Sequence, residues 1–285
     1  MILFSIQLIL TVLSTIAYAI FGSYPQGILG ILVLAGIALA AFLGVFVCYF
    51  ISGTIYIILN TKTDPKNMGK HRLYNEIGSY LFRVLLRVRI VASGLENLPK
   101  NNCFVAFANH SELSDPVYLK QILKDYPMAF LAKEELFHYP ILKQLLISAG
   151  CIPLFRGMDR KGLQAIIDTI KAIKNGQPMG IFPEGTRSYS NQMIPFKAGA
   201  FKVALKAGAD ICPVCLYNMQ GVLSLKRIRC HTAYIHVCPL IPYESIKEMD
   251  TSSLAQVVQE RIQIQMDQFE AIYGQQPKAE GQGSC

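Results

Sequence analysis

The sequence predicts an α/β fold: a mixed, largely parallel sheet flanked by helices and preceded by an N-terminal membrane helical hairpin. Two observations lead to this prediction. Residues 1–59 contain no Asp, Glu, Lys, Arg or His, so the formal net charge of +8 lies on the rest of the 285-residue chain. From about residue 87, short runs rich in Val, Ile and Phe alternate with amphipathic stretches, which is typical of parallel strands covered by helices.

The uncharged segment divides into two apolar stretches, 1–21 and Ile28–Leu59. A transmembrane helix needs about 20 mostly apolar residues. Residues 22–27 between them contain a proline and two glycines, which favours a turn. A cleaved signal peptide is the alternative for residues 1–22, but a basic start is missing and the apolar stretch resumes after the turn. We therefore expect residues 1–59 to be a hairpin embedded in the bilayer.

The next segment, 60–89, is basic. Its positive residues are Lys62, Lys66, Lys70, Arg72, Arg83, Arg87 and Arg89, against only Asp64 and Glu76. The positive-inside rule places this flank, and the domain that follows it, on the cytoplasmic face, which is that of the inner membrane in a bacterium. The apolar spacing within 60–89 predicts an amphipathic helix. Either a helix lying on anionic headgroups or a solvated surface helix fits that spacing.

Residues 90–273 are expected to form the catalytic domain. We expect strands at 87–93, 103–108, 128–132, 151–155, 178–182, 211–216 and 233–238, and helices at 115–125, 139–149, 163–175, 197–207 and 252–273. Asp115 before Pro116 is expected to cap its helix, and Ser252 or Ser253 to cap the last one. The polar tail 274–285 is expected to be disordered.

The eight cysteines do not form the compact framework of a small secreted domain, which favours a reducing compartment. Cys212 and Cys215 with Cys230, His231, His236 and Cys238 could be considered as a zinc site. Both stretches have the pattern of apolar strands without the polar turn that such a site favours. We therefore expect no metal.

The first motif that carries chemistry is Asn109-His110-Ser111-Glu112-Leu113-Ser114-Asp115, directly after an apolar strand. Histidine is the side chain best suited to accept a proton near neutral pH. A carboxylate that fixes its tautomer strengthens this role. The spacing allows Asp115 to reach His110 across a strand-to-helix turn. A plain helix cap at Asp115 and a structural turn histidine remain the alternative.

A second motif, Glu184-Gly185-Thr186-Arg187, also follows a strand. Its glycine permits close approach of the backbone to a ligand, and the arginine presents a planar fork that matches phosphate oxygens. Further candidates at or near strand ends are Lys133, Arg156, Lys197 and Pro213. The chain has no Gly-x-Ser-x-Gly elbow, Walker lysine loop or dinucleotide fingerprint. A histidine base without its own serine therefore suggests that the substrate supplies the nucleophile, as a hydroxyl.

The ordered set of His110, Asp115, Arg156, the Glu184-Gly185-Thr186-Arg187 segment and Pro213 resembles the 1-acyl-sn-glycerol-3-phosphate acyltransferase (lysophosphatidic acid acyltransferase) family. The similarity runs from about residue 90 to residue 240. It includes 131–137 and 196–200, which look like the intervening segments of that family. One departure is Phe155, where the family often carries a polar residue.

The resemblance implies acyl transfer from a thioester, acyl-CoA or acyl-ACP, to the free hydroxyl of lysophosphatidic acid, forming phosphatidic acid. His110 would be the general base and Asp115 its support. Arg156, Glu184, Gly185, Thr186 and Arg187, with Lys133 and Lys197, would hold the acceptor, and Pro213 would belong to the acyl-donor region. The expected partners are the bilayer, the lysophospholipid and the thioester. No further cofactor and no nucleic acid are expected.

Other functions fit the same motifs. The acceptor could be glycerol 3-phosphate or another lysophospholipid, or water could replace it in a lipid hydrolase. A non-enzymatic lipid-binding module is a third class, which the intact His110, Asp115, Glu184 and Arg187 disfavour.

Overall fold

The computed structural model describes residues 2–155, 160–224 and 229–274. It divides the chain into two compact units, residues 1–60 and 61–285. The boundary falls one residue after the predicted end of the hairpin. The tail expected to be disordered lies, from residue 275 onwards, outside the described residues, and so does Arg156.

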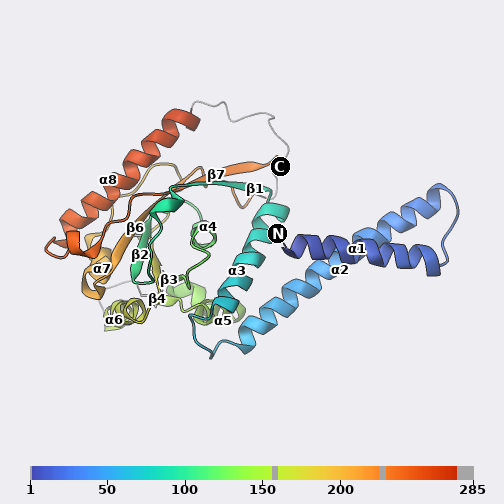
Figure 1. Cartoon of the computed structure of the whole chain (residues 1–285), viewed down its shortest axis with the longest axis horizontal. Coiled ribbons are helices and arrows are strands. Elements are labelled where there is room, and N and C mark those ends of the chain that lie inside the picture. The colour runs from blue at the N-terminus through green and yellow to red at the C-terminus, as the bar shows by residue number, and fades with distance from the viewer. Residues whose placement is uncertain (1, 156–159, 225–228, 275–285) are drawn as a thin grey trace. The chain divides into compact units, whose positions relative to one another are not determined.

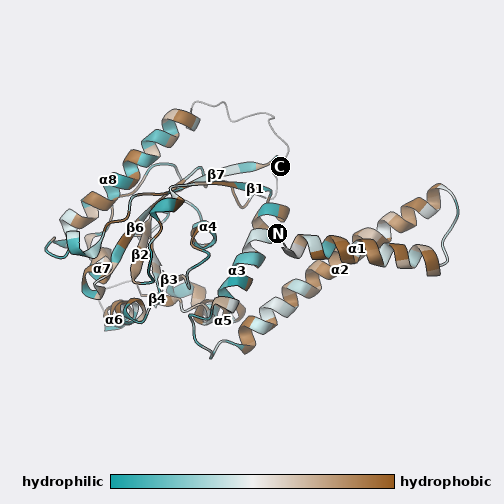
Figure 2. Cartoon of the chain, in the orientation of Figure 1, coloured by the Kyte–Doolittle hydropathy of each residue, from teal (hydrophilic) through white to brown (hydrophobic). Residues whose placement is uncertain are grey.

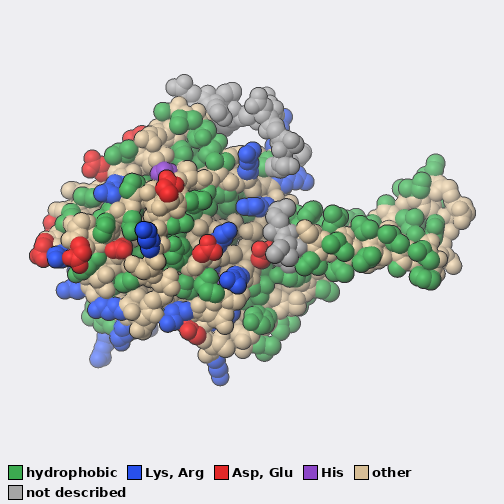
Figure 3. Space-filling view, viewed as in Figure 1, with side chains coloured by type: hydrophobic (Ala, Val, Ile, Leu, Met, Phe, Trp, Pro, Cys, Tyr) green, Lys and Arg blue, Asp and Glu red, His purple; other side chains and the backbone are tan. Residues whose placement is uncertain are grey.

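The first unit is an apolar helical hairpin. Its helices are α1 (Ile2–Phe21) and α2 (Ile28–Leu59), and both are long and apolar enough to cross a membrane. The side-chain amide of Gln7 donates to the carbonyl of Phe42 at 2.6 Å, so the buried polar group on α1 has its partner on α2. The helices are almost entirely apolar (Figure 2), and no charged side chain interrupts their surface (Figure 3).

The second unit is built on a seven-stranded sheet of order β1-β7-β6-β2-β5-β3-β4 within the described residues. Its strands are β1 (Val88–Ser93), β2 (Phe104–Ala108), β3 (Ala129–Lys133), β4 (Ile152–Leu154), β5 (Met179–Ile181), β6 (Asp210–Tyr217) and β7 (His231–Val237). Strands β6, β2, β5, β3 and β4 are mutually parallel, whereas β7 runs antiparallel to β6 and parallel to β1. The predicted mixed, largely parallel sheet is confirmed.

Helices cover both faces of this sheet (Figure 1). One face carries α3 (Met68–Tyr80), α4 (Asp115–Ile122) and α5 (Pro140–Ser148), and the other carries α6 (Arg160–Lys174), α7 (Lys202–Ala207) and α8 (Thr251–Phe269). Short helical turns complete the fold, of the π type at Leu81–Leu85 and Glu270–Gly274 and of the 3₁₀ type at Leu95–Asn97, Glu134–His138, Ala198–Phe201 and Tyr243–Ser245.

The connections define where a ligand can bind. From β2 the chain crosses through α4 to β3 on one side, and from the neighbouring β5 it crosses through α7 to β6 on the other. Adjacent parallel strands whose connections leave on opposite faces open a crevice at their carboxyl ends. The first motif follows β2 and the second follows β5. The topology thus brings both motifs to this crevice.

The structure corrects three local predictions. The last helix is capped by Asp250, whose carboxylate accepts from the backbone N–H groups of Ser252 and Ser253, so neither serine is the cap. The helix expected at 197–207 begins as the 3₁₀ turn Ala198–Phe201 and becomes α-helical only from Lys202. Asp115 is the first residue of α4 rather than its cap. Helix ends vary by one or two residues with the local hydrogen bonds, and at Asp115 the carboxylate is bonded to the preceding loop instead of capping the helix.

A buried polar cluster attaches α3 to the sheet domain. The ammonium of Lys120 on α4 lies 2.5 Å from Nδ1 of His71 and donates to the carbonyl of Met128 at 2.7 Å. Nε2 of His71 lies 2.8 Å from the carbonyl of Pro65, and the hydroxyl of Tyr74 donates to the carbonyl of Leu145. The segment expected to be a basic surface helix is therefore partly buried.

Candidate active site

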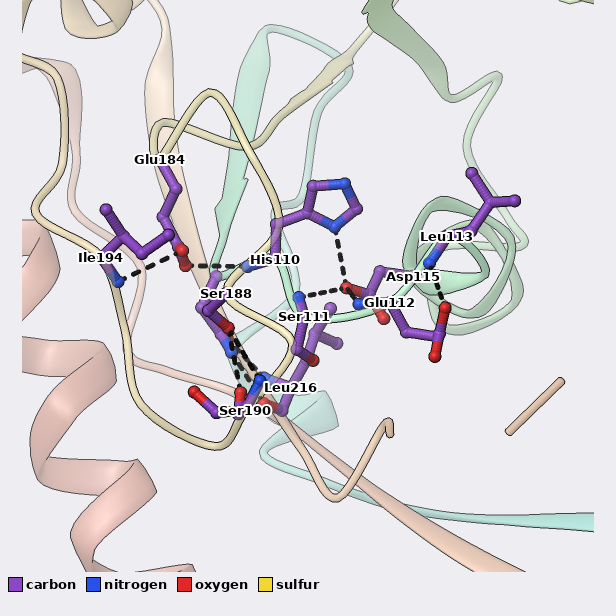
Figure 4. Close-up of polar contacts among 11 residues, drawn as sticks. His110, Ser111, Glu112, Leu113, Asp115, Glu184, Ser188, Ser190, Ile194 and Leu216 are labelled. Carbon is purple, nitrogen blue, oxygen red and sulfur yellow. Dashed lines mark hydrogen bonds and ion pairs between the residues drawn. The ribbon is translucent and has the colours of Figure 1, made fainter. Parts of the chain in front are cut away.

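The predicted histidine–carboxylate pair is formed. Nδ1 of His110 lies 2.8 Å from Oδ2 of Asp115 (Figure 4). The Asp115 side chain is fully buried, whereas 18% of the His110 side chain is exposed. Among the described residues no hydrogen bond occupies Nε2 of His110. The arrangement leaves one ring nitrogen held by a carboxylate and the other available to a substrate.

Asp115 is itself held by the loop that precedes α4. Its Oδ2 also accepts from the backbone N–H groups of Ser111 at 2.7 Å and Glu112 at 2.8 Å. These bonds explain why Asp115 does not cap its own helix, because the oxygen points back toward the strand end. A carboxylate fixed in this way favours the tautomer in which Nδ1 carries the proton and Nε2 is basic.

The second motif lies against the same histidine. The Phe182 ring stacks on the imidazole with centroids 4.3 Å apart. The Glu184 carboxylate accepts from the backbone N–H of His110 at 2.9 Å, and the backbone N–H of Ser188 donates to the carbonyl of His110 at 2.8 Å. Figure 4 shows Glu184 and Ser188 converging on the His110 backbone while Asp115 faces the ring.

Glu184 is only 1% exposed. Its Oε2 accepts from the backbone N–H of Ile194 at 3.2 Å, so both carboxylate oxygens have backbone donors. Burial raises the pKa of Glu184 to about 7, although the donated N–H groups of His110 and Ile194 act in the opposite direction. The group therefore changes charge close to neutral pH.

Two positive side chains lie in or beside the second motif, Arg187 within it and Lys197 next to Gly185. The guanidinium of Arg187 lies over the Tyr189 ring, 4.8 Å from its centroid. Gly185 has φ +70°, and a Cβ at this position would come within 2.7 Å of Nζ of Lys197. Glycine is favoured here by the left-handed backbone conformation, whereas the flexible end of the Lys197 side chain could shift to admit a Cβ. Thr186, between Gly185 and Arg187, is exposed.

The remaining predicted residues are placed differently. Lys133, at the carboxyl end of β3, forms an ion pair with Glu135 at 2.8 Å, both side chains being half exposed. Pro213 is buried in the middle of β6 opposite Phe107, so it does not join the strand-end residues. It lies where the pairing of β6 with β7 stops.

The described residues contain no group of three or more His, Cys, Asp or Glu that could hold a metal ion.

No role was predicted from the sequence for the first residue of the histidine motif, Asn109. The Asn109 amide donates to the carbonyl of Leu216 and accepts from its N–H, both at 2.8 Å. The side-chain amide thereby takes the place of a backbone peptide group. It extends the hydrogen bonding between β2 and β6 by one residue beyond Ala108, to Asn109 itself. The only signal in the sequence was an amide residue directly before the histidine.

Comparisons with known proteins identify the family of this chain. A family model described as Acyltransferase matches residues 89–217. The 1-acyl-sn-glycerol-3-phosphate acyltransferase of Borreliella burgdorferi is 34% identical over 181 residues, which cover 62% of this chain and 72% of that protein. The enzyme of the same name from Salmonella typhimurium is 28% identical over 68% of this chain and 77% of its own length.

Two further matches extend this picture. A chloroplastic 1-acyl-sn-glycerol-3-phosphate acyltransferase of Arabidopsis thaliana is 32% identical, but the match spans only 52% of that longer protein. The crystal structure of the 1-acyl-sn-glycerophosphate acyltransferase PlsC from Thermotoga maritima superposes with a TM-score of 0.63 at 22% identity, covering 76% of this chain and 88% of that one. This likeness shows a shared fold. With the Borreliella match, the comparisons establish that the chain is an acyltransferase and belongs to the 1-acyl-sn-glycerol-3-phosphate acyltransferase family.

Proposed function

We propose that this enzyme transfers a fatty acyl group from acyl-CoA or acyl-ACP to the free hydroxyl of lysophosphatidic acid, forming phosphatidic acid. The observation that carries the proposal is the His110–Asp115 pair, 2.8 Å apart, held against the segment that carries Arg187 by the bonds of Glu184 and Ser188 to the His110 backbone. The relatives named for this reaction support the choice of acceptor.

In this reaction Nε2 of His110 takes the proton of the acceptor hydroxyl as its oxygen attacks the thioester carbonyl. The imidazolium that forms is stabilised by Asp115. When the tetrahedral intermediate collapses, the C–S bond breaks and the leaving sulfur takes the proton from Nε2. Positioned general-base catalysis of this kind contributes about 10²–10⁴-fold to the rate.

The acceptor carries a phosphate, which the cations of the second motif are suited to bind. Arg187 offers paired N–H donors and Lys197 adds a positive charge beside Gly185. Thr186 and Lys133 are the further candidates, and Lys133 would have to exchange its partner Glu135 for the phosphate. Arg156 remains a predicted acceptor ligand that lies outside the described residues. Because Pro213 is buried within β6, any contribution to an acyl-binding region would come from the position of that strand and not from contact of the proline ring with the acyl chain.

We also propose that the hairpin α1–α2 anchors the enzyme in the membrane, with the catalytic unit on the cytoplasmic face, the inner face of the inner membrane in a bacterium. The two apolar helices support membrane attachment, and the basic segment that follows supports the side. Such an anchor keeps the catalytic unit where an amphiphilic acceptor is concentrated.

The test is an acyl-transfer assay of the full chain in lipid, with acyl-CoA and acyl-ACP in turn. The acceptors are lysophosphatidic acid, glycerol 3-phosphate, other lysophospholipids and none, and His110→Ala is the blank. Phosphatidic acid formation with lysophosphatidic acid is the expected result. If glycerol 3-phosphate or another lysophospholipid were acylated faster than lysophosphatidic acid, that molecule would be the acceptor instead. Fatty acid release without an acceptor would indicate a hydrolase, and no thioester consumption would contradict an enzymatic role.

A further inference from the structure

The segment 182–188 contacts the ring, the backbone N–H and the backbone carbonyl of His110. Phe182 stacks on the ring, the Glu184 carboxylate accepts from the backbone N–H, and the backbone N–H of Ser188 donates to the carbonyl. These contacts join residues about 70 positions apart in the sequence, at the adjacent ends of β2 and β5 (Figure 4). The second motif therefore does more than present cations to a phosphate.

We propose that Glu184 is a positioning residue that fixes the backbone of His110, rather than a ligand of the acceptor. Because segment 182–188 also carries Arg187, it fixes the position of the base relative to the position expected for the acceptor phosphate. This inference rests on the proposed function and assigns to one residue of that site a different role from the one the family resemblance implies.

The surroundings of Glu184 argue against direct binding of the acceptor. The side chain is 1% exposed and both its oxygens accept from backbone donors, of His110 and Ile194. A glycerol hydroxyl could reach these oxygens only if the surrounding segments moved, because the carboxylate is almost completely buried. Arg187, by contrast, is partly exposed.

The loop that holds the His110 backbone also contains the residue expected to bind the phosphate. Gly185 and Arg187 lie between Glu184 and Ser188, so the expected phosphate ligand is flanked on both sides by residues bonded to the His110 backbone. A displacement of this loop would move the base and the acceptor site together. Misplacement of a reacting group by about 1 Å can cost on the order of 10²-fold in rate, so fixing the base to this loop has a direct catalytic value.

The experiment compares kcat and the KM for lysophosphatidic acid in the full-length wild type, Glu184→Gln and Glu184→Ala. Glutamine retains one acceptor oxygen, whereas alanine retains none. We expect kcat to fall about 10-fold in Glu184→Gln and about 100-fold in Glu184→Ala, with the acceptor KM unchanged in both. The matched control is Glu244→Gln, because the Glu244 side chain is 78% exposed in an ion pair with Lys247. The control should retain wild-type kinetics.

A second variant, Phe182→Leu, perturbs the same histidine through its ring and leaves Glu184 in place. It should also lower kcat without raising the acceptor KM, and it provides the test if Glu184→Ala does not fold. A raised KM with unchanged kcat in Glu184→Gln would overturn the inference, since that pattern is the loss of a ground-state ligand. Wild-type kcat in both Glu184→Gln and Phe182→Leu would overturn it as well. Absence of transfer by the wild type would instead count against the proposed function.

Discussion

Oδ2 of Asp115 accepts three hydrogen bonds, from Nδ1 of His110 and from the backbone N–H groups of Ser111 and Glu112. The histidine thus receives a carboxylate that is already oriented by the loop between them. Because the oxygen serves both the ring and the backbone, this loop fixes the tautomer of the base as well as its own conformation.

Replacement of Asp115 by asparagine should remove the negative charge that stabilises the imidazolium. The amide oxygen would take the place of Oδ2, where three N–H groups converge, so Nδ1 would keep its proton and only the charge would be lost. We expect kcat to fall about 10²-fold, the lower end of the contribution of a positioned general base. Steady-state kinetics with Asp168→Asn, whose side chain is 47% exposed on α6, provides the control. Retained activity in Asp115→Asn would exclude this role for the carboxylate.

Replacement of His110 by alanine should abolish acyl transfer and leave the fold intact, because the side chain lies at a strand end and is partly exposed. The measurement is phosphatidic acid formation, with thermal unfolding as the check on folding. Turnover close to that of the wild type would refute general-base catalysis by this residue.

Replacement of Arg187 by alanine should mainly weaken acceptor binding. Loss of a hydrogen bond to a charged group costs roughly 1.5–3 kcal/mol, which corresponds to a rise of about 10-fold to 100-fold in the acceptor KM. Lys171→Ala is the control, since that side chain is 68% exposed on α6 outside the proposed site. If the dependence of the rate on lysophosphatidic acid did not change, Arg187 would have no part in holding the acceptor.

Replacement of Asn109 by alanine should destabilise the protein. The substitution leaves the N–H and carbonyl of Leu216, both in a buried strand, without their side-chain partner. Unsatisfied buried groups of this kind cost roughly 1–3 kcal/mol each. Chemical denaturation in detergent should show a lower unfolding midpoint than in the wild type, and Gln256→Ala, at an exposed position of α8, should not. An unchanged midpoint would mean that this amide pairing contributes nothing to stability.

The buried Lys120 should make stability depend on pH. Burial lowers the pKa of its ammonium to about 7, whereas in the unfolded chain it remains near the ordinary value for lysine. Between pH 7 and pH 9 the unfolded state therefore binds more protons than the folded state. Lys120 should then make a contribution to the free energy of unfolding that rises with pH in this window, by at most about 1.4 kcal/mol for each unit.

Neighbouring groups must be separated from this contribution. The pKa of His71 is lowered to about 3, chiefly by burial, so its ring is neutral above pH 7. Burial raises the pKa of Cys151, so its thiol ionises first in the unfolded chain and acts in the opposite direction toward pH 9; comparison with a variant that keeps Cys151 removes this effect. Unfolding midpoints of the wild type and Lys120→Met at both ends of the window test the prediction. Equal slopes in the two proteins would contradict it.

The sequence by itself determined the parts of this protein that depend on local pattern. Uncharged residues 1–59 predicted the hairpin, because nothing in them requires water. Alternating apolar periods predicted the strands and helices of the sheet domain. The spacing of His110 and Asp115 predicted their contact, because four intervening residues can close a turn at a strand end.

Only the tertiary structure decided which distant segments meet. That β5 pairs with β2, and so brings Glu184 and Ser188 to the backbone of His110, follows from strand order, which local propensity does not encode. The same holds for the amide of Asn109 on Leu216 and for Pro213 in the middle of a strand. These placements depend on which apolar faces pack together across the whole sheet, and that is a property of the folded chain.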